Sequence, residues 1–540
     1  MKPLVLLACS LLCASTCTLR ADVAISVDAA LDRHAIDPRI YGVAFASSDQ
    51  LGLLRAPLNR SGGNSTSGYN WQLNATKVGN DYFFESIPSD SATPGESADT
   101  FVQAARSGGS EPMLTIPMLP WIANLGPNRG KLASFSVAKY GAQQKTDQWM
   151  PDAGNGQKPD GTKVTGNDPR DAGTPNSPEL QAAWVKHLVT KWGRASATAN
   201  RGGVKYFILD NEPALWSGTH RDVQPVGIKI GELAQKIIAT SHAIKAVDPL
   251  AQTVAPEEWG WTGFLYSGFD SGLGPSVGWD TSKLPDRKAN GGQDAFPALM
   301  KLLRASDAQT RSRALDIVTL HYYPQGGEFS DDVSPAMQDR RNRSTRSLWD
   351  PNYKDETWIA ANVRLIPRLR EWANGYRANV PIGITEYNWG AEKHINGATT
   401  QADIWGIFGR EGVDVAARWT TPPTGSPTFK AMQLMRNADG AGHGFGDTSV
   451  RCSAPNSDQV SAFAALRGED KALTLLLINK QREASEVASV EVKNFAARGI
   501  TQMWQLTSKN VIGALTTTDG PTGRLRVPLP AQSVTLMVLK

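Results

Sequence analysis

Short apolar runs alternate with amphipathic stretches from about residue 40 to about residue 441. The run 206–209 (Tyr-Phe-Ile-Leu), which stops at polar residues, is typical of a buried strand. The segment 226–247 carries an apolar residue every three or four positions, which is typical of a helix packed on one face. Helices are predicted over 98–107, 178–192, 226–247, 295–303, 356–373, 402–409 and 428–435. Strand ends are predicted in 40–45, 113–118, 206–209, 253–259, 315–324, 382–386 and 413–419.

Strands that alternate with helices at this spacing indicate βα units and a parallel sheet. About eight such units fit a closed (β/α)8 TIM-like barrel better than an open sheet. From about residue 442 the sequence pattern changes to short predicted strands separated by Gly, Pro and Asn turns, which is typical of a β-sandwich. We therefore predict an α/β fold with N-terminal strands in 22–39 that join the sandwich, a barrel over 40–441, and a sandwich over 442–540.

The first 21 residues predict a secretory signal peptide, with Lys2 followed by an apolar run over 4–14 and small residues. Three of the four cysteines lie in this segment, so the mature chain keeps only Cys452 and cannot form an internal disulfide. We expect a protein that is extracellular or periplasmic after signal removal.

The charge of the chain argues against a nucleic-acid partner. The formal charge is +4, and loss of Lys2 and Arg20 leaves about +2, which is too little for nucleic-acid binding. Beyond the N-terminus no apolar stretch approaches the length of a membrane span. We expect a monomer without a membrane partner.

Two predicted strands end on a glutamate. Asp210-Asn-Glu212 follows the run 206–209, and Glu386 ends the run that starts at Ile382. A carboxylate at the end of a buried strand is costly unless it has a partner or a function. Glycoside hydrolysis requires two carboxyl groups that flank the scissile bond. Glu212 and Glu386 are therefore the predicted catalytic pair, and structural ion pairing is the alternative.

Several motifs together resemble glycoside hydrolase family 44. They are Ile40-Tyr-Gly-Val, Arg60-Ser-Gly-Gly-Asn-Ser-Thr, Tyr69-Asn-Trp, Asp210-Asn-Glu-Pro, Pro256-Glu-Glu-Trp-Gly-Trp, His321-Tyr-Tyr-Pro and Thr385-Glu-Tyr-Asn-Trp-Gly. The resemblance spans nearly the whole mature chain. It implies a barrel plus sandwich, with Glu212 as acid/base and Glu386 as nucleophile of a retaining endo-β-1,4-glucanase. It implies carboxymethylcellulose and xyloglucan as substrates, and in some members xylan or mannan.

Other polar and aromatic residues near the predicted strand ends are candidate substrate contacts. Asn211 is suited to bind the sugar 2-hydroxyl, and we expect Tyr323 or His321 to donate a hydrogen bond to the nucleophile. Tryptophan rings stack on sugar faces, and core packing is the alternative for each of them. The predicted substrate residues are Arg60, Asn64, Trp71, Asn211, Glu258, Trp259, His321, Tyr323, Trp349, Trp358, Trp389 and Trp419.

No cofactor is expected for the chemistry, but a structural calcium ion is one interpretation of the acidic insertion 126–177. Carboxylate oxygens bind calcium, and the resemblance implies a site near here. The candidate ligands are Glu85, Asp168 and Asp171, and a solvated acidic loop is the alternative. An arabinofuranosidase-like exo-enzyme and a non-catalytic polysaccharide-binding protein remain alternative functions.

Overall fold

The computed structural model describes residues 22–196, 198, 202–496, 499–515 and 524–540. The predicted signal peptide lies outside these described residues.

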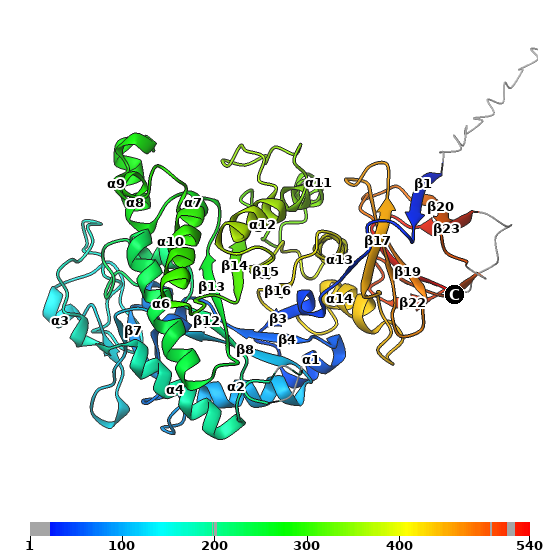
Figure 1. Cartoon of the computed structure of the whole chain (residues 1–540). Helices are drawn as coiled ribbons and strands as arrows, with labels where there is room; N and C mark the ends of the chain where they lie inside the picture. Colours follow the sequence, from blue (N-terminus) through cyan, green and yellow to red (C-terminus); the bar gives the residue numbers. More distant parts are fainter. Residues whose placement is uncertain (1–21, 197, 199–201, 497–498, 516–523) are drawn as a thin grey trace, which may run out of the picture.

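Eight parallel strands close into a barrel in the order β12-β13-β14-β15-β16-β3-β4-β8 (Figure 1). Their bounds are β3 Gly42–Ala44, β4 Leu58–Ser61, β8 Glu111–Ile116, β12 Tyr206–Leu209, β13 Gln252–Glu258, β14 Ile317–Tyr322, β15 Ile382–Tyr387 and β16 Val415–Arg418. The predicted barrel is confirmed. Since all strands run parallel, their carboxyl ends lie at one rim, where such barrels carry their chemistry.

Apolar side chains from six of the strands fill a layer of the barrel. The buried residues of this cluster are Leu58, Met113, Tyr206, Ile208, Val254, Ile317 and Val415. This packed layer makes the barrel a solid support for the polar residues at the strand ends.

Helices cover the outside of the barrel (Figure 1). The longer ones are α2 Glu96–Ser107, α4 Pro178–Trp192, α6 Ile230–Val247, α10 Ala295–Thr310, α11 Pro335–Ser344, α12 Leu365–Tyr376, α13 Ile395–Arg410 and α14 Pro427–Asn437. The shorter ones are α1 Ser48–Leu54, α3 Val137–Tyr140, α5 Trp216–Thr219, α7 Trp261–Leu265, α8 Gly268–Leu273 and α9 Pro285–Ala289. Helix α4 has the predicted bounds, because the Ser177 side chain accepts a hydrogen bond from the Leu180 amide and Pro178 occupies the first turn.

The prediction of a helix over 356–373 is wrong at its start, since α12 begins at Leu365. The preceding loop is organised by Asp355, whose carboxylate accepts hydrogen bonds from the backbone amide and the hydroxyl of Thr357, at 2.9 and 2.5 Å. Such local side-chain bonds compete with helix formation.

Short strands in the insertions form two further sheets beside the barrel. A four-stranded sheet contains β5 Tyr69–Asn70, β6 Ala75–Lys77, β7 Glu85–Pro88 and β10 Leu132–Ala133. A two-stranded sheet pairs β9 Trp121–Ala123 with β11 Gly173–Pro175.

The remaining strands form a ten-stranded sheet with the predicted contribution from the N-terminus. Strand β1 Val23–Asp28 pairs parallel with β20 and antiparallel with β17, and β2 His34–Ala35 pairs with β17. The other bounds are β17 Thr448–Ser453, β18 Val460–Leu466, β19 Leu473–Asn479, β20 Glu486–Lys493, β21 Ile500–Leu506, β22 Ile512–Ala514, β23 Leu525–Leu529 and β24 Ser533–Leu539. The sheet domain lies beside α13 and α14, and a buried ion pair of 2.6 Å between Lys480 and Asp403 joins it to α13 (Figure 1).

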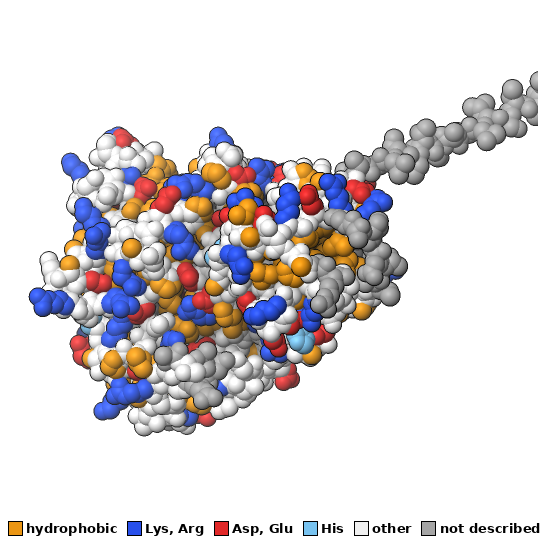
Figure 2. Space-filling model, turned by 45° about the vertical axis from the view of Figure 1, so that its right-hand side comes forward, with side chains coloured by type: hydrophobic (Ala, Val, Ile, Leu, Met, Phe, Trp, Pro, Cys, Tyr) orange, Lys and Arg blue, Asp and Glu red, His pale blue; other side chains and the backbone are white. Residues whose placement is uncertain are grey.

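Within the described part of the chain, the helices all fall short of the length and apolarity needed to cross a membrane. Figure 2 shows basic and acidic side chains interspersed over the face in view.

Candidate active site

The turn after β12 carries three polar residues in an unusual backbone conformation. Asp210 and Glu212 have φ values of 65° and 44°, in the left-handed region that ordinary residues rarely adopt. The Asp210 carboxylate accepts hydrogen bonds from the backbone amides of Met118, Leu119 and Asn211. Such strain persists only where surrounding bonds enforce it, and it is common at functional sites.

Glu212 and Glu386, 174 residues apart in the sequence, meet at the barrel rim. One carboxylate oxygen of each, together with a ring nitrogen of His321, lie within 4.8 Å of one another. The two side chains are 13% and 9% exposed, so a substrate bond can reach both of them. This arrangement brings together the two glutamates that the sequence singled out.

Both oxygens of Glu386 accept hydrogen bonds from residues of other barrel strands or of the loops that follow them. Arg60 on β4 donates from Nη1 to Oε2 at 2.8 Å, and Tyr323 after β14 donates from its hydroxyl to Oε1 at 2.8 Å. A guanidinium and a phenol on opposite oxygens stabilise an ionised carboxylate. The expected bond from Tyr323 to Glu386 is therefore present.

Glu212 has a different environment. Burial raises its pKa, as does the charge of Glu386, whereas the hydrogen bond and charge of His321 oppose this shift. His321 on β14 donates from Nδ1 to Oε1 of Glu212 at 2.9 Å. Because Oε1 already accepts this bond, a proton held by Glu212 resides on Oε2.

Glu257, which the sequence analysis did not select, lies beneath this pair and is fully buried. Its Oε2 accepts hydrogen bonds from Nε2 of His321 at 2.9 Å and from Nη2 of Arg60 at 3.0 Å. Burial by itself raises the pKa of Glu257, but these partners hold it at about 2. Glu257 is therefore an ionised carboxylate inside the barrel.

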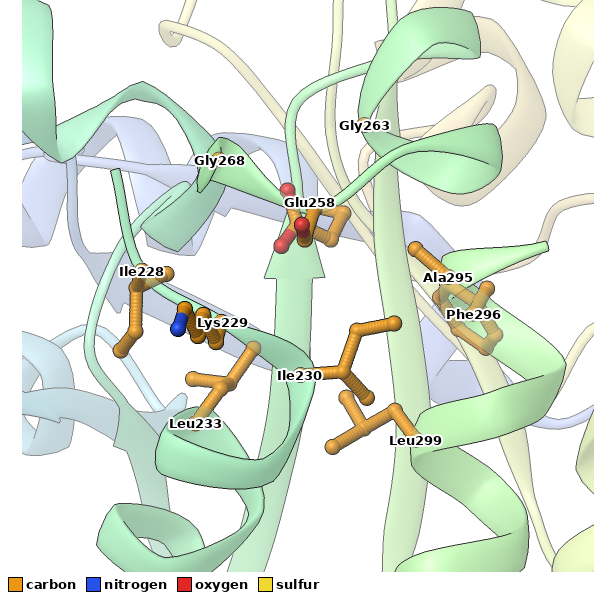
Figure 3. Close-up of a pocket in the computed structure, with 11 residues that line it drawn as sticks. Ile228, Lys229, Ile230, Leu233, Glu258, Gly263, Gly268, Ala295, Phe296 and Leu299 are labelled. Atoms are coloured by element: carbon orange, nitrogen blue, oxygen red, sulfur yellow. The ribbon is translucent and has the colours of Figure 1, made fainter. Parts of the chain in front are cut away.

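The prediction that Glu258 contacts substrate is wrong. Glu258 is 5% exposed and lines a cavity between β13 and the helices α6 and α10, together with Ile230 and Phe296 (Figure 3). The register of β13 against β14 shifts between Pro256 and Glu258, so Glu257 takes the inward position. Burial and the charge of Glu212 raise the pKa of Glu258 to about 8, so this carboxyl is neutral at pH 7.

The other polar candidates, Arg60, Asn64 and Asn211, form hydrogen bonds to other residues of the site. Arg60 is fully buried against carboxylates, which corrects its assignment as a sugar ligand. Oδ1 of Asn211 accepts a hydrogen bond from the Gly63 amide at 3.2 Å, and its Nδ2 donates to Oδ1 of Asn64 at 3.1 Å. Asn64 also donates to Asp81, so these side chains tie the loop after β4 to the turn of Glu212.

Comparison with known proteins now decides the family. The model of glycoside hydrolase family 44 matches residues 75–326. CelM2, a bifunctional glucanase-xylanase from a metagenome library, is 53% identical over 96% of this chain and 99% of its own, with a TM-score of 0.94. The chain belongs to glycoside hydrolase family 44.

A family 44 xyloglucanase from Paenibacillus polymyxa is 25% identical, with a TM-score of 0.79 over 96% of this chain and 99% of its own. Endoglucanase A of Paenibacillus lautus is 28% identical over 496 residues, which are 86% of this chain. The chain spans 65% of the length of that endoglucanase and 34% of a second curated relative. The family resemblance drawn from the motifs is confirmed.

Aromatic side chains of this family 44 chain lie close to Arg60 and Tyr323, the two residues that donate hydrogen bonds to Glu386. The Trp419 ring is 5.8 Å from the Arg60 guanidinium and 5.6 Å from the Phe45 ring, which is 45% exposed. Trp358 is 57% exposed and donates a hydrogen bond to Gln325, whose side chain donates to the carbonyl of Tyr323. Trp259 is partly exposed at the end of β13.

Three predicted substrate tryptophans have partners other than the residues around Glu212 and Glu386, and the burial of Trp389 corrects its assignment. Trp389 is 2% exposed and donates to the Ser344 hydroxyl. Trp71 donates to the Leu180 carbonyl on α4. Trp349 lies under the guanidinium of Arg410, at 4.3 Å, near the sheet domain. In each case the partner is distant in the sequence, and Trp389 is buried, whereas Trp71 and Trp349 are partly exposed.

Two of the three candidate calcium ligands, Asp168 and Asp171, have basic or hydroxyl partners. Asp168 pairs with Arg170, and Asp171 pairs with Lys139 and Tyr140, so neither completes a site with Glu85. Among the described residues, only Glu212, His321 and Glu386 form a group of three metal-binding side chains. Within that group, Glu212 accepts a hydrogen bond from His321, and Glu386 accepts hydrogen bonds from Arg60 and Tyr323.

Glu85 has a different acidic neighbour, Asp147. Both are buried, burial and the neighbouring Asp147 raise the pKa of Glu85, and Oε1 of Glu85 and Oδ2 of Asp147 lack a hydrogen-bond donor. Lys131 lies 3.2 Å from Glu85 and 4.0 Å from Asp147. Calcium takes about six to eight oxygen ligands, so these two carboxylates would supply part of a calcium site.

Proposed function

We propose that the protein is a secreted, retaining endo-β-1,4-glucanase that hydrolyses internal bonds of β-glucans. Carboxymethylcellulose and xyloglucan are the proposed main substrates, with xylan and mannan as further ones, and the enzyme acts as a monomer. The observation that carries the proposal is the approach of Glu212 and Glu386 to within 4.8 Å in unlike environments. The printed functions of CelM2 and of the Paenibacillus relatives support this substrate class.

In the first step Glu212 donates its proton from Oε2 to the glycosidic oxygen while Glu386 attacks the anomeric carbon. The bond to the leaving sugar breaks as the bond to Glu386 forms, which yields a covalent glycosyl-enzyme. The raised pKa of Glu212 favours its protonated form, and the adjacent His321 stabilises the negative charge that Glu212 carries after it has given up the proton.

In the second step Glu212, now ionised, removes a proton from water, which attacks the anomeric carbon and displaces Glu386. Two inversions give net retention. Retaining enzymes place the carboxyl groups about 5–5.5 Å apart, whereas inverting enzymes need about 6.5–9.5 Å for an intervening water. The short distance here supports retention.

No cofactor takes part in this mechanism. We propose that Glu85 and Asp147 hold a structural calcium ion, which would link β7 to the insertion loop.

The test is to incubate the purified protein with carboxymethylcellulose, xyloglucan, xylan and mannan, and to measure both reducing ends and viscosity. We expect reducing ends together with a rapid fall in viscosity, and products that start as the β-anomer by NMR. Reducing ends without loss of viscosity would indicate an exo-enzyme, and binding without reducing ends would indicate a binding protein. Either result would overturn the proposal.

A further inference from the structure

The Glu257 carboxylate is too deeply buried to contact substrate. It contacts His321 and Arg60, which in turn contact Glu212 and Glu386. Its side chain is fully buried below the rim, and its φ of 56° turns it into the barrel. Its backbone carbonyl also accepts a hydrogen bond from the Glu212 amide at 3.1 Å. The residue is thus joined to Glu212 through the backbone and, by way of His321, through side chains.

All four hydrogen bonds to the Glu257 carboxylate come from other barrel strands. Oε1 accepts from the hydroxyls of Thr319 and Thr385, at 2.5 and 2.6 Å. Oε2 accepts from His321 and Arg60. A carboxylate with four donors has one orientation, so it defines where the two cationic groups lie.

The two cationic groups need this anion. Nε2 of His321 lies only 3.1 Å from Nη2 of Arg60, a distance at which two donors repel unless they share an acceptor. Oε2 of Glu257 is that shared acceptor. Beyond it, the charged groups that face His321 are Glu212 and Glu386.

Burial alone lowers the pKa of His321, but the charge of Glu386 and the hydrogen bonds to Glu212 and Glu257 raise it to about 10. His321 is then an imidazolium with both ring nitrogens donating. A glutamate below it and a glutamate above it give the ring a fixed orientation, as a carboxylate does for histidines in other active sites.

We propose that Glu257 is a positioning residue that holds His321 and Arg60 in place, so that His321 donates to Glu212 and Arg60 donates to Glu386. The role in hydrolysis rests on the proposed function, whereas the effect on His321 does not. Loss of the Glu257 charge leaves Arg60 and His321 as neighbouring cations, and His321 then releases its proton.

The first variant is Glu257→Gln, with Glu258→Gln as matched control. Both positions are buried glutamates on the same strand, but Glu258 faces the cavity outside the barrel and is neutral at pH 7. We expect kcat on carboxymethylcellulose to fall about 10²-fold in Glu257→Gln, the size of effect that a small misplacement of reacting groups produces. KM should change little, and Glu258→Gln should keep the wild-type kcat.

A structural defect alone would also lower kcat, so the state of His321 is measured directly. Protein labelled with ¹⁵N-histidine, with the His321 signals assigned from His321→Asn, should show both ring nitrogens protonated at pH 8 in the wild type and in Glu258→Gln. In Glu257→Gln one of them should have lost its proton at this pH. This readout needs no substrate, so it stands even if the wild type hydrolyses no glucan.

Wild-type His321 signals in a folded Glu257→Gln would overturn the proposal, as would an unchanged kcat. If Glu257→Gln does not fold by circular dichroism, the double variant Thr319→Val, Thr385→Val takes its place. It keeps the charge but removes both donors to Oε1. We expect kcat to fall about tenfold, consistent with the loss of hydrogen bonds to a charged group, and wild-type kcat in this variant would overturn the proposal.

Discussion

His321 Nδ1 lies 2.9 Å from Oε1 of Glu212, while its other ring nitrogen lies 2.9 Å from Oε2 of Glu257. The imidazole thus connects Glu212 at the rim to the ionised carboxylate of Glu257 inside the barrel. The two rim glutamates therefore have different partners: Glu212 accepts a hydrogen bond from a histidine, and Glu386 accepts hydrogen bonds from Arg60 and Tyr323.

Replacement of Glu212 by alanine should lower kcat/KM on carboxymethylcellulose by about 10²–10⁴-fold, the usual contribution of a general acid. The kcat/KM of this variant on an aryl cellobioside with an acidic leaving group should fall far less, since departure of that group needs no proton. Because the pKa of Glu212 is raised, the wild type should lose activity on the alkaline side as this carboxyl ionises, and the variant should lack that limb. The kcat/KM values of both proteins on the two substrates check the first point, and the pH profiles of kcat/KM on carboxymethylcellulose check the second.

Replacement of Glu386 by glycine should abolish turnover of all substrates, including activated ones. Azide should restore part of the activity and give an α-glycosyl azide, whereas azide with Glu212→Ala should give the β-anomer. NMR of the two products distinguishes the roles. The same anomer from both variants would contradict the assignment of acid and nucleophile.

Removal of the Tyr323 hydroxyl should slow hydrolysis, because Glu386 loses one of its hydrogen-bond donors. Its hydrogen bond to a charged oxygen is worth about 1.5–3 kcal/mol, so Tyr323→Phe should lose about 10- to 150-fold in kcat/KM. Tyr322→Phe is the matched control, because the adjacent hydroxyl faces Asp355 and lies away from Glu386. Equal losses in the two variants would show that the hydroxyl of Tyr323 has no special role.

Truncation of Trp419 should weaken substrate binding. Stacking on an aromatic ring contributes about 0.5–1.5 kcal/mol beyond area burial, so Trp419→Ala should raise KM on cello-oligosaccharides several-fold. Trp349→Ala should leave KM unchanged and lower the melting temperature, since that ring packs under Arg410. Steady-state kinetics and thermal unfolding of both variants test this contrast.

Calcium should raise the melting temperature of the wild type, and a chelator should reverse the rise, because a ligand that binds only the folded state stabilises it. Asp147→Asn should abolish this response, since it removes one of the two orphaned carboxylates. Asp168→Asn should retain it, because Asp168 pairs with Arg170. A response that depends on Asp168 and not on Asp147 would restore the original ligand set.

The sequence by itself determined the barrel and the identity of the two rim glutamates. Apolar runs that stop in Asp210-Asn-Glu212 and in Glu386 mark the carboxyl ends of strands, and parallel strands bring such ends to one rim. Helix α4 was also predictable, because its cap and its apolar face are local features.

Tertiary structure alone decided which neighbour each side chain meets. The register shift in β13 turns Glu257 inward and Glu258 outward, and no pattern in Pro256-Glu-Glu distinguishes them. Arg60, Trp389 and the Glu85–Asp147 pair took their places through contacts with residues far away in the sequence. Periodicity reports whether a residue lies in a strand, but the partner of a buried charge depends on how the strands pack, and that information is not local.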